Sequence, residues 1–268
     1  MQQWKNRVAV VTGASAGIGA AITKDLVKAG MITIGLARRV ERVEKLRKDF
    51  PEGLGKNLHA IKCDITKEDE ILQVFTEIDA KFGGIDVLIN NAGTYKSFYL
   101  THDNNSDAMR EVINMNVLAA VFCTREAFKS MSKHGRNSHV VHINSIAAHS
   151  IPIFNSRYSS NVSSASKHAL KVITEVHRQE FIQSKLHIKV SSVSPGFVHT
   201  ELTKRECGEK RVLKTPHLQP EDVSQSVLHV LESPPHVEIH ELIIKPFGEV
   251  FPLEFNRKFI GEEPYSKL

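Results

Sequence analysis

The sequence has little of what secreted, membrane-spanning or zinc-binding proteins use. It contains only three cysteines in 268 residues. Cys63, Cys123 and Cys207 are odd in number and widely spaced, which excludes a disulfide framework and the spacing of zinc ligands. The polar residues 1–7 lead to an apolar run of only four residues, which is too short for a signal peptide or a spanning helix. We therefore expect a cytoplasmic protein without a membrane partner.

The sequence also lacks a run of charge of one sign. Its formal net charge of +5 is spread along the chain, and this disfavours nucleic acid as a partner, since such a surface gathers basic residues on one face. Histidine is plentiful, but His139 and His142 are three residues apart in a predicted strand and so face opposite sides of a sheet. We therefore predict no metal site. A hydrophobic content of 41% indicates a folded globular protein.

A glycine-rich loop directly follows the first apolar run. Residues 8–19 read VAVVTGASAGIG, which predicts a strand, a turn and a helix that extends to about residue 29. Gly13 can adopt backbone angles that a side chain forbids, Gly17 leaves room for a phosphate, and Gly19 lets the helix lie close to the strand. A strand, turn and helix with incidental glycines is the alternative. The residues expected to contact a nucleotide are Gly13, Ser15, Ala16, Gly17, Ile18 and Gly19.

Apolar runs alternate with helical periodicity along the rest of the chain. The predicted strands are 8–11, 32–36, 58–61, 87–89, 140–143, 190–193 and 239–244, and the longer helices are 67–82, 106–132, 164–183 and 220–231. This alternation indicates an α/β fold with a doubly wound, parallel sheet of seven strands. We expect a single domain over 1–248 and a C-terminal extension of it over 249–268. Ligands collect at the carboxyl ends of such strands, where Thr12, Asp64, Asn90, Ser145 and Pro195 stand.

No carboxylate follows the second predicted strand, where an acidic residue would bind the ribose 2′-hydroxyl of NAD. The chain reads GLARR over residues 35–39. Arginine at this place favours a 2′-phosphate, because its planar guanidinium can donate two hydrogen bonds to a phosphate. Arg38 and Arg39 therefore predict NADP as the cofactor. The alternative is that both side chains only solvate the start of a helix.

Further motifs occur in a definite order. The glycine-rich loop is followed by NNAG at 90–93, Asn116, Ser145, SK at 166–167 and PG at 195–196. In this order they resemble the motifs of the short-chain dehydrogenase/reductase family, over nearly the whole chain. The stretches SKHAL at 166–170 and IHEL at 239–242 are similar to its farnesol-dehydrogenase-like branch. The resemblance implies a Rossmann-type fold and an oxidoreductase.

The resemblance extends the expected cofactor site beyond the glycine-rich loop. Asp64 and Ile65 match the pair that contacts the adenine in the family, although Asp64 could also cap the helix that begins near Lys67. The NNAG turn is expected to steady the sheet, because an asparagine side chain can bond to the backbone of a turn. The loop 195–200 matches the one that meets the nicotinamide. The contacts so implied are Asp64, Ile65, Asn91, Ala92, Gly93, Lys167, Pro195, Gly196, Val198 and Thr200.

Three of the four catalytic residues of the family have a counterpart. Ser145 matches the serine that steadies the substrate oxygen, Asn116 the asparagine that holds a water of the proton relay, and Lys167 the lysine that binds the ribose and lowers the pKa of a tyrosine. From the residues alone, Ser145 could instead form a turn at a strand end. Asn116 could instead be a hydrogen-bonding residue inside a helix.

The fourth residue, the tyrosine that serves as acid and base, is missing. Ser163 stands four residues before Lys167, and serine is a far weaker acid than tyrosine, whose pKa is about 10. Tyr158 stands thirteen residues after Ser145, a common spacing in the family, but nine residues before Lys167. In a continuous helix these two side chains would lie on opposite faces. Tyr158 could take the role only from an unwound segment, and is otherwise a lid or surface residue.

These features predict an NADP-dependent oxidoreductase for an apolar, isoprenoid-like alcohol or carbonyl compound, with catalysis weakened or altered at Ser163. The alternative is a non-catalytic NADP-binding protein, a redox sensor or assembly partner. We also expect a homodimer or homotetramer, because the helices 106–132 and 164–183 carry more apolar positions than one sheet face needs and pair across a two-fold axis in relatives. The residues expected to flank the substrate are Tyr95, Phe98, Tyr99, Ile151, Ile153, Phe154 and Leu202.

Overall fold

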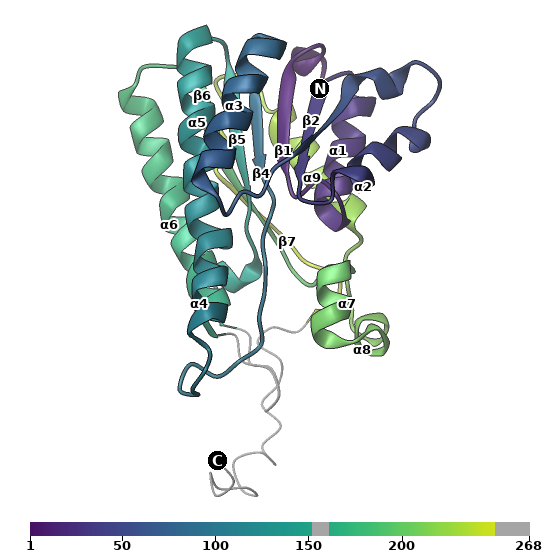
Figure 1. The fold of residues 1–268 in the computed structure, drawn as a ribbon, viewed down its shortest axis with the longest axis vertical. Helices are drawn as coiled ribbons and strands as arrows, with labels where there is room; N and C mark the ends of the chain where they lie inside the picture. Colours follow the sequence, from purple (N-terminus) through teal and green to yellow (C-terminus); the bar gives the residue numbers. More distant parts are fainter. Residues whose placement is uncertain (152–160, 250–268) are drawn as a thin grey trace, which may run out of the picture.

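The fold is built on one parallel sheet of seven strands in the order β3-β2-β1-β4-β5-β6-β7 (Figure 1). This computed structural model describes residues 1–151 and 161–249. The chain winds outward in opposite directions from β1 and β4, which pair with each other at the centre. The predicted doubly wound sheet is therefore confirmed. The strands are β1 Val8–Thr12, β2 Ile32–Ala37, β3 Leu58–Lys62, β4 Val87–Asn90, β5 Ser138–Ile143, β6 Ile188–Pro195 and β7 Glu241–Ile244.

Helices cover both faces of the sheet (Figure 1). On one face lie α1 Gly17–Lys28, α2 Val40–Lys45 and α9 Pro220–Glu232, and on the other lie α3 Glu68–Phe82, α5 Ala119–His134 and α6 Asn161–Gln183, with α4 Ser106–Ile113 leading into α5. Beyond the carboxyl ends of the strands lie α7 Glu201–Cys207 and α8 Glu209–Lys214. Short 3-10 helices span Gln2–Trp4, Leu46–Asp49, Leu54–Asn57 and Ile146–Ala148.

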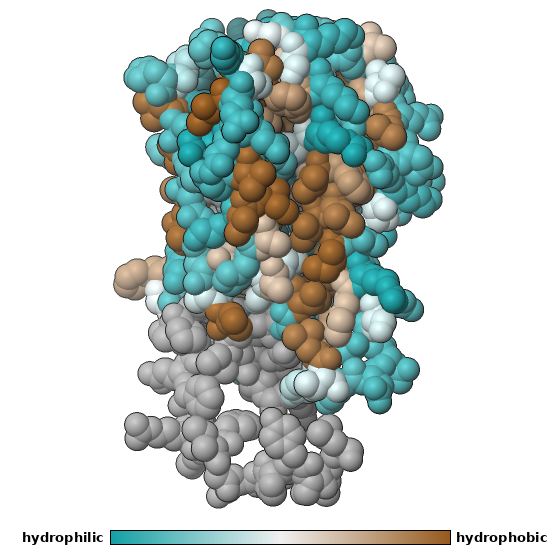
Figure 2. Space-filling view, turned by 90° about the vertical axis from the view of Figure 1, so that its left-hand side faces the viewer, coloured by the Kyte–Doolittle hydropathy of each residue, from teal (hydrophilic) through white to brown (hydrophobic). Residues whose placement is uncertain are grey.

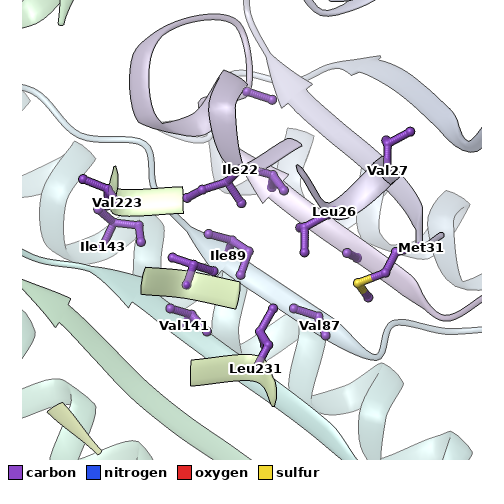
Figure 3. Packing of buried hydrophobic residues seen from close by; sticks show 14 of the residues in the cluster. Ile22, Leu26, Val27, Met31, Val87, Ile89, Val141, Ile143, Val223 and Leu231 are labelled. Atoms are coloured by element: carbon purple, nitrogen blue, oxygen red, sulfur yellow. The ribbon is translucent and has the colours of Figure 1, made fainter. Parts of the chain in front are cut away.

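The core between the sheet and α1 and α9 fixes the helix that follows the glycine-rich loop. Figure 3 shows Ile22 and Leu26 of α1 beside the sheet residues Val87 and Ile89, with Leu231 of α9 next to them. Each of these five residues has an exposed fraction of 0%, and burying such a side chain contributes about 1.5–3 kcal/mol. The amino end of α1 is thus held at the carboxyl edge of the sheet.

A carboxylate ties α3 to α5 on the other face. Asp79 of α3 accepts hydrogen bonds from Ser130 Oγ at 2.6 Å and Lys133 Nζ at 2.6 Å, and lies 2.9 Å from His134 Nε2. Partial burial alone would raise the pKa of Asp79, but these partners outweigh it and lower the pKa to about 2. The charged form of Asp79 therefore stabilises the contact between the two helices.

The predicted helix 106–132 differs from the observed one in its middle. A π-helical turn at Asn114–Leu118 separates α4 from α5, although the chain continues without a loop. Such turns insert an extra residue into the helix and are frequent at functional sites. Here the turn contains Asn116, whose side chain contacts another segment, as described below. The hydrophobic periodicity predicted one continuous helix over 106–132 and did not reveal this turn.

Two predictions fall largely outside the described residues. The C-terminal extension 249–268 is described only at Glu249, and Tyr158, Ile153 and Phe154 lie in 152–160. The last strand begins at Glu241 rather than at residue 239. Before it, the backbone N–H of Val190 in β6 donates to the side chain of Glu238 and not to a carbonyl oxygen of this segment, so the ladder does not extend further. Over the ranges 1–151 and 161–249, no helix combines the length and the apolar character that crossing a membrane requires.

Candidate active site

Two glycines of the glycine-rich loop, Gly13 and Gly19, leave no room for a side chain. Gly13 has a φ of +69°, and a Cβ there would lie 2.9 Å from the Cα of Ala92, so that any other residue would be strained and crowded. A Cβ on Gly19 would overlap the carbonyl oxygen of Gly13. The N-cap residue of α1 is Ala16, and no side chain of the described part caps this helix. Its first amides can therefore bind an anion. Half-buried in the same loop are Ser15, Gly17 and Ile18.

Asn91 connects the carboxyl ends of β1 and β4. Its Nδ2 donates to the carbonyl oxygen of Thr12 at 2.9 Å and to that of Gly13 at 3.4 Å. In return, Thr12 Oγ1 accepts from the backbone N–H groups of Asn91 at 3.0 Å and of Ala92 at 3.1 Å. The expectation that the NNAG turn steadies the sheet is confirmed by these four bonds. They hold the glycine-rich loop against the next strand.

Two arginines follow β2 at the place where the sequence lacks an acid. Arg38 and Arg39 are exposed, and Arg38 makes no hydrogen bond or ion pair with residues 1–151 or 161–249. Arg39 Nη2 lies 3.5 Å from Glu201 Oε2. The helix α2 begins directly after Arg39 without a side-chain cap among the described residues. This corner of the site is thus positively charged.

Asp64 forms a local turn and does not cap α3. Its Oδ1 accepts from the backbone N–H of Thr66 at 3.1 Å and from Thr66 Oγ1 at 2.8 Å. Although desolvation opposes them, these bonds, together with the charges of Arg38 and Lys67, hold the pKa of Asp64 below its ordinary value. The N-cap residue of α3 is Lys67, so the interpretation of Asp64 as a helix cap was wrong. Ile65 is buried in the core beside it.

Lys167 extends from α6 to the end of β5. Its Nζ donates to the carbonyl oxygen of Ile143 at 3.0 Å, two residues before Ser145. Burial lowers the pKa of this ammonium from 10.5 to about 8, because the charged form loses solvation. The lysine is still mostly protonated at pH 7, but it gives up its proton more easily than an ordinary lysine.

Ser163 lies one helical turn before Lys167 on α6, as expected from their spacing. The residue is buried, and its Oγ has no hydrogen-bond partner among the described residues. The backbone carbonyl of Ser163 accepts from Ser166 Oγ at 2.6 Å. A buried hydroxyl without a partner costs free energy, so no bond of the Ser163 side chain to the described residues stabilises the helix.

Asn116 joins the segment after β4 to α6. Its Oδ1 accepts from the backbone N–H of Thr94 at 2.8 Å, and its Nδ2 donates to the carbonyl oxygen of Thr94 at 3.0 Å and to Ser166 Oγ at 2.9 Å. A Cβ on Gly93 would lie 3.4 Å from Asn116 Oδ1 and 3.9 Å from Lys167 Nζ. The structure therefore brings Gly93, Asn116 and Lys167 together. Asn116 bonds across segments, not within its own helix.

Ser145 lies two residues after the end of β5 and is the N-cap residue of the short 3-10 helix Ile146–Ala148. Its Oγ accepts from the backbone N–H of Ala147 at 3.1 Å, so the interpretation of Ser145 as a turn former holds. This bond uses the hydroxyl only as an acceptor. Its own hydrogen stays available for another oxygen, and the two interpretations of Ser145 are compatible.

The loop after β6 is fixed at several points. The N–H of Gly196 donates to the carbonyl oxygen of Ile244 at 2.7 Å, and the N–H of Phe197 donates to Glu249 Oε1 at 2.9 Å. Desolvation raises the pKa of Glu249. No signal in the sequence pointed to Glu249, since it follows the last strand and contacts a loop about fifty residues earlier. The other expected contacts of the loop after β6 are Pro195 at the end of β6, Val198, which pairs with Leu218, and Thr200, the N-cap residue of α7.

The two strand histidines, His139 and His142, contact different residues. His139 Nε2 lies 2.8 Å from Ser191 Oγ, whereas His142 contacts Asn90 at 3.3 Å and His177 at 3.4 Å. Burial lowers the pKa of His139 to about 3 and that of His177 to about 4, so these rings are neutral. Among the residues with described positions, no group of three side chains could hold a metal ion.

Comparison with known proteins agrees with this arrangement. The family model for short chain dehydrogenase matches residues 7–210. The chain belongs to the short-chain dehydrogenase family. It is similar to a protein named farnesol dehydrogenase from Aedes aegypti, with 49% identity over 94% of this chain and 100% of that protein. It is also similar to dehydrogenase/reductase SDR family member 11 of the mouse, with 35% identity over 93% of this chain and 98% of that protein.

Solved structures of the family have the same fold. The closed form of a serine dehydrogenase complexed with NADP+ has a TM-score of 0.80 and 27% identity, over 93% of this chain and 98% of that one. A short chain dehydrogenase from Burkholderia cenocepacia in complex with NADP has a TM-score of 0.77 and 26% identity, over 90% of this chain and 97% of that one. The Rossmann-type fold is therefore shown both by topology and by these neighbours.

Proposed function

We propose that this protein is an NADP(H)-dependent oxidoreductase that interconverts an apolar alcohol, of the isoprenoid-like kind, and its carbonyl compound. The observation that carries the proposal is the joint placement of Asn116 and Lys167 at the carboxyl edge of the sheet, with Lys167 bonded two residues before Ser145. Membership of the family and the similarity to a farnesol dehydrogenase support the class of substrate. The site faces the same edge as the glycine-rich loop.

The residues present fit a dinucleotide with a 2′-phosphate. The Gly13 turn cannot accept a side chain, the first amides of α1 lack a side-chain cap, and Arg38 has no ion-pair partner among the described residues. The pyrophosphate would bind at the amino end of α1 and the 2′-phosphate at the arginines. That relatives of 26–27% identity are complexed with NADP supports this choice. The further contacts would come from the Asp64 turn, residues 91–93 and the loop 195–200.

A bound nicotinamide would supply or accept the hydride. The chain itself has to hold the substrate oxygen and move its proton. The free hydrogen of the Ser145 hydroxyl can be donated to the substrate oxygen. Lys167, with a pKa of about 8, can bind the ribose and exchange a proton near neutral pH. Ser163 stands where the family has its acid, and a serine hydroxyl transfers protons poorly. We therefore expect slow turnover.

An experiment at Ser163 tests this proposal. Ser163→Tyr should increase NADPH-dependent reduction of reactive carbonyl compounds by about two to four powers of ten, which is the usual effect of a positioned acid. Ser163→Phe is the matched control, because it has nearly the same size without the hydroxyl and should give no gain. Circular dichroism and NADPH binding must first show that both variants fold.

Two other outcomes would contradict the proposed function or the role given to Ser163. If neither the natural protein nor a folded Ser163→Tyr variant reduces any carbonyl compound while both bind NADPH, the protein is the non-catalytic NADP-binding protein of the alternative. If the natural protein turns over rapidly and Tyr158→Phe abolishes the rate, then Tyr158 is the acid. In that case the expectation of slow turnover through Ser163 is wrong.

We also propose that the protein forms a homodimer or homotetramer through α5 and α6. Figure 2 shows bands of apolar residues along this side of the molecule, and α6 exposes Val172 and Val176 one turn apart, with Ile182 further along. Exposed apolar patches of this kind on a folded protein are typical of contact surfaces. A two-fold axis would bring the same patch of a second copy against it.

A further inference from the structure

One carboxylate joins α2 to α7, two helices far apart in the sequence. Glu201, the first residue of α7, accepts from Arg42 Nη1 with both oxygens, at 2.8 Å and 3.0 Å. Arg39 Nη2 lies 3.5 Å from Oε2 of the same carboxylate. The side chain of Glu201 is 60% exposed and that of Arg42 is 40% exposed. Glu201 therefore serves as the counter-ion for two arginines at the surface.

The residue before Glu201 touches the glycine-rich loop. A Cβ on Gly17 would lie 3.3 Å from the Cγ2 of Thr200, so the amino end of α7 lies against the start of α1. Figure 1 shows α7 beyond the carboxyl ends of the strands, next to α1 and α2. The amino end of α7 thus lies beside the glycine-rich loop at Thr200 and pairs with the arginines through Glu201.

The carboxylate pairs with two of the three arginines at this corner, Arg39 and Arg42, whose guanidinium groups could also donate to a phosphate. Arg38 and Arg39 precede α2, and Arg42 lies one turn further on the helix. A phosphate ester dianion has more charge than a carboxylate and three oxygens with which to accept hydrogen bonds. An exposed ion pair such as that of Glu201 and Arg42 contributes at most a small free energy. A bound phosphate could therefore displace it.

We propose that Glu201 is a specificity-determining and positioning residue: it competes with the 2′-phosphate of the cofactor for Arg39 and Arg42, and the phosphate releases α7 when it binds. This inference rests on the proposed binding of NADP. Coupling between two groups that bind the same site is reciprocal. The Glu201 carboxylate therefore lowers the affinity of the arginines for the phosphate by the same factor by which the phosphate weakens the ion pairs between Glu201 and the arginines. Cofactors without the 2′-phosphate should leave the Glu201 ion pair intact.

Binding of ligands with and without the phosphate tests the proposal. Glu201→Gln should bind NADPH and 2′,5′-ADP about two- to fivefold more tightly than the natural protein at low salt, the range expected for an exposed ion pair. Its affinity for NADH and 5′-AMP should not change. Glu201→Asp keeps the charge and should behave like the natural protein. High salt should reduce the difference, since exposed charges are screened.

Glu206→Gln is the matched control. Glu206 lies on the same helix, but its carboxylate pairs with the neighbouring Arg205 at 2.8 Å and not with α2, so this variant loses one charge without freeing the arginines. Amide hydrogen exchange gives a second measurement. Adding 2′,5′-ADP should accelerate exchange in α7 of the natural protein, and Glu201→Gln should show the faster exchange without any ligand.

The possible outcomes distinguish a failure of the proposed cofactor from a failure of the proposed role of Glu201. If no form binds NADPH or 2′,5′-ADP, the proposed cofactor is wrong. If the natural protein binds NADPH but Glu201→Gln binds it equally, or tightens NADH to the same degree, the counter-ion role is overturned while the proposed function stands. Tighter NADPH binding in Glu206→Gln of the same size would also overturn it, since a general change of charge would then explain the effect.

Discussion

Replacing Lys167 with methionine should stabilise the protein at neutral pH while it removes the site's ammonium. The side chain keeps a similar length and loses its charge. Burial lowers the pKa of Lys167 from 10.5 to about 8, so the folded protein holds a charged group in surroundings that disfavour the charge. In Lys167→Met this unfavourable term is absent.

The size of the expected stabilisation follows from the pKa shift of Lys167. A lowering of about 2.5 units corresponds to about 3 kcal/mol, at roughly 1.4 kcal/mol for each unit. Lys167 is only half-buried as a residue, and water that reaches the side chain reduces this figure. The substitution also removes the bond to the carbonyl oxygen of Ile143, which costs about 1 kcal/mol. We expect Lys167→Met to raise the free energy of unfolding by about 1 kcal/mol at pH 7.

The effect should depend on pH in a defined direction. Between the folded pKa of about 8 and the unfolded pKa of 10.5, the unfolded chain binds more protons at Lys167 than the folded one, so the stability of the natural protein rises with pH. The penalty is complete below pH 8 and disappears near pH 10.5. The advantage of Lys167→Met should therefore decrease over this range and reverse at its upper end.

Urea unfolding of the cofactor-free natural protein and of Lys167→Met, at pH 7 and at pH 10, measures the difference in their free energies of unfolding. Burial raises the pKa of Cys63 to about 12 and that of Cys123 still further, which lowers stability above pH 9, but this contribution is common to both proteins and cancels in their difference. Lys171→Met is the control, since Lys171 lies one turn further along α6 and is exposed. A variant that is less stable than the natural protein at pH 7, or whose difference does not change with pH, would refute the reasoning.

Three further predictions concern the cofactor, the α3–α5 contact and assembly. Arg38→Asp should abolish a preference for NADPH over NADH that we expect to exceed about tenfold in the natural protein, and equal affinities in the natural protein would contradict the choice of NADP. Asp79→Asn should lower the free energy of unfolding by about 2 kcal/mol at pH 7. This loss should vanish as acid protonates Asp79 between pH 3.8 and about 2. Asp107→Asn, which changes an exposed ion pair on α4, should have no effect in the same denaturation assay. Sedimentation at micromolar concentration should show a dimer or tetramer, and Val176→Glu should shift it toward the monomer, whereas a monomer in the natural protein would count against the α5–α6 contact.

The strands and the glycine-rich loop were predictable because their signals are local. A buried parallel strand is apolar at nearly every position, and the positive φ of Gly13 excludes other residues at this turn whatever surrounds it. The ends of elements were less certain. The last strand begins two residues later than predicted, because the backbone N–H of Val190 bonds to the side chain of Glu238. The helix α3 begins after Lys67 without a cap from Asp64, because the Asp64 carboxylate bonds to Thr66 in a local turn.

The sequence by itself determined the fold class, the missing acid and the positive charge after β2, since a serine in place of a tyrosine and an arginine in place of a carboxylate are visible without coordinates. Only the tertiary structure decided which groups meet. The bonds of Asn116 to Thr94 and Ser166, the burial that shifts Lys167, and the pairing of Arg42 with Glu201 across 159 positions depend on how the helices pack on the sheet. Packing sums many weak contacts over the whole chain, so it leaves no pattern at the residues that it brings together.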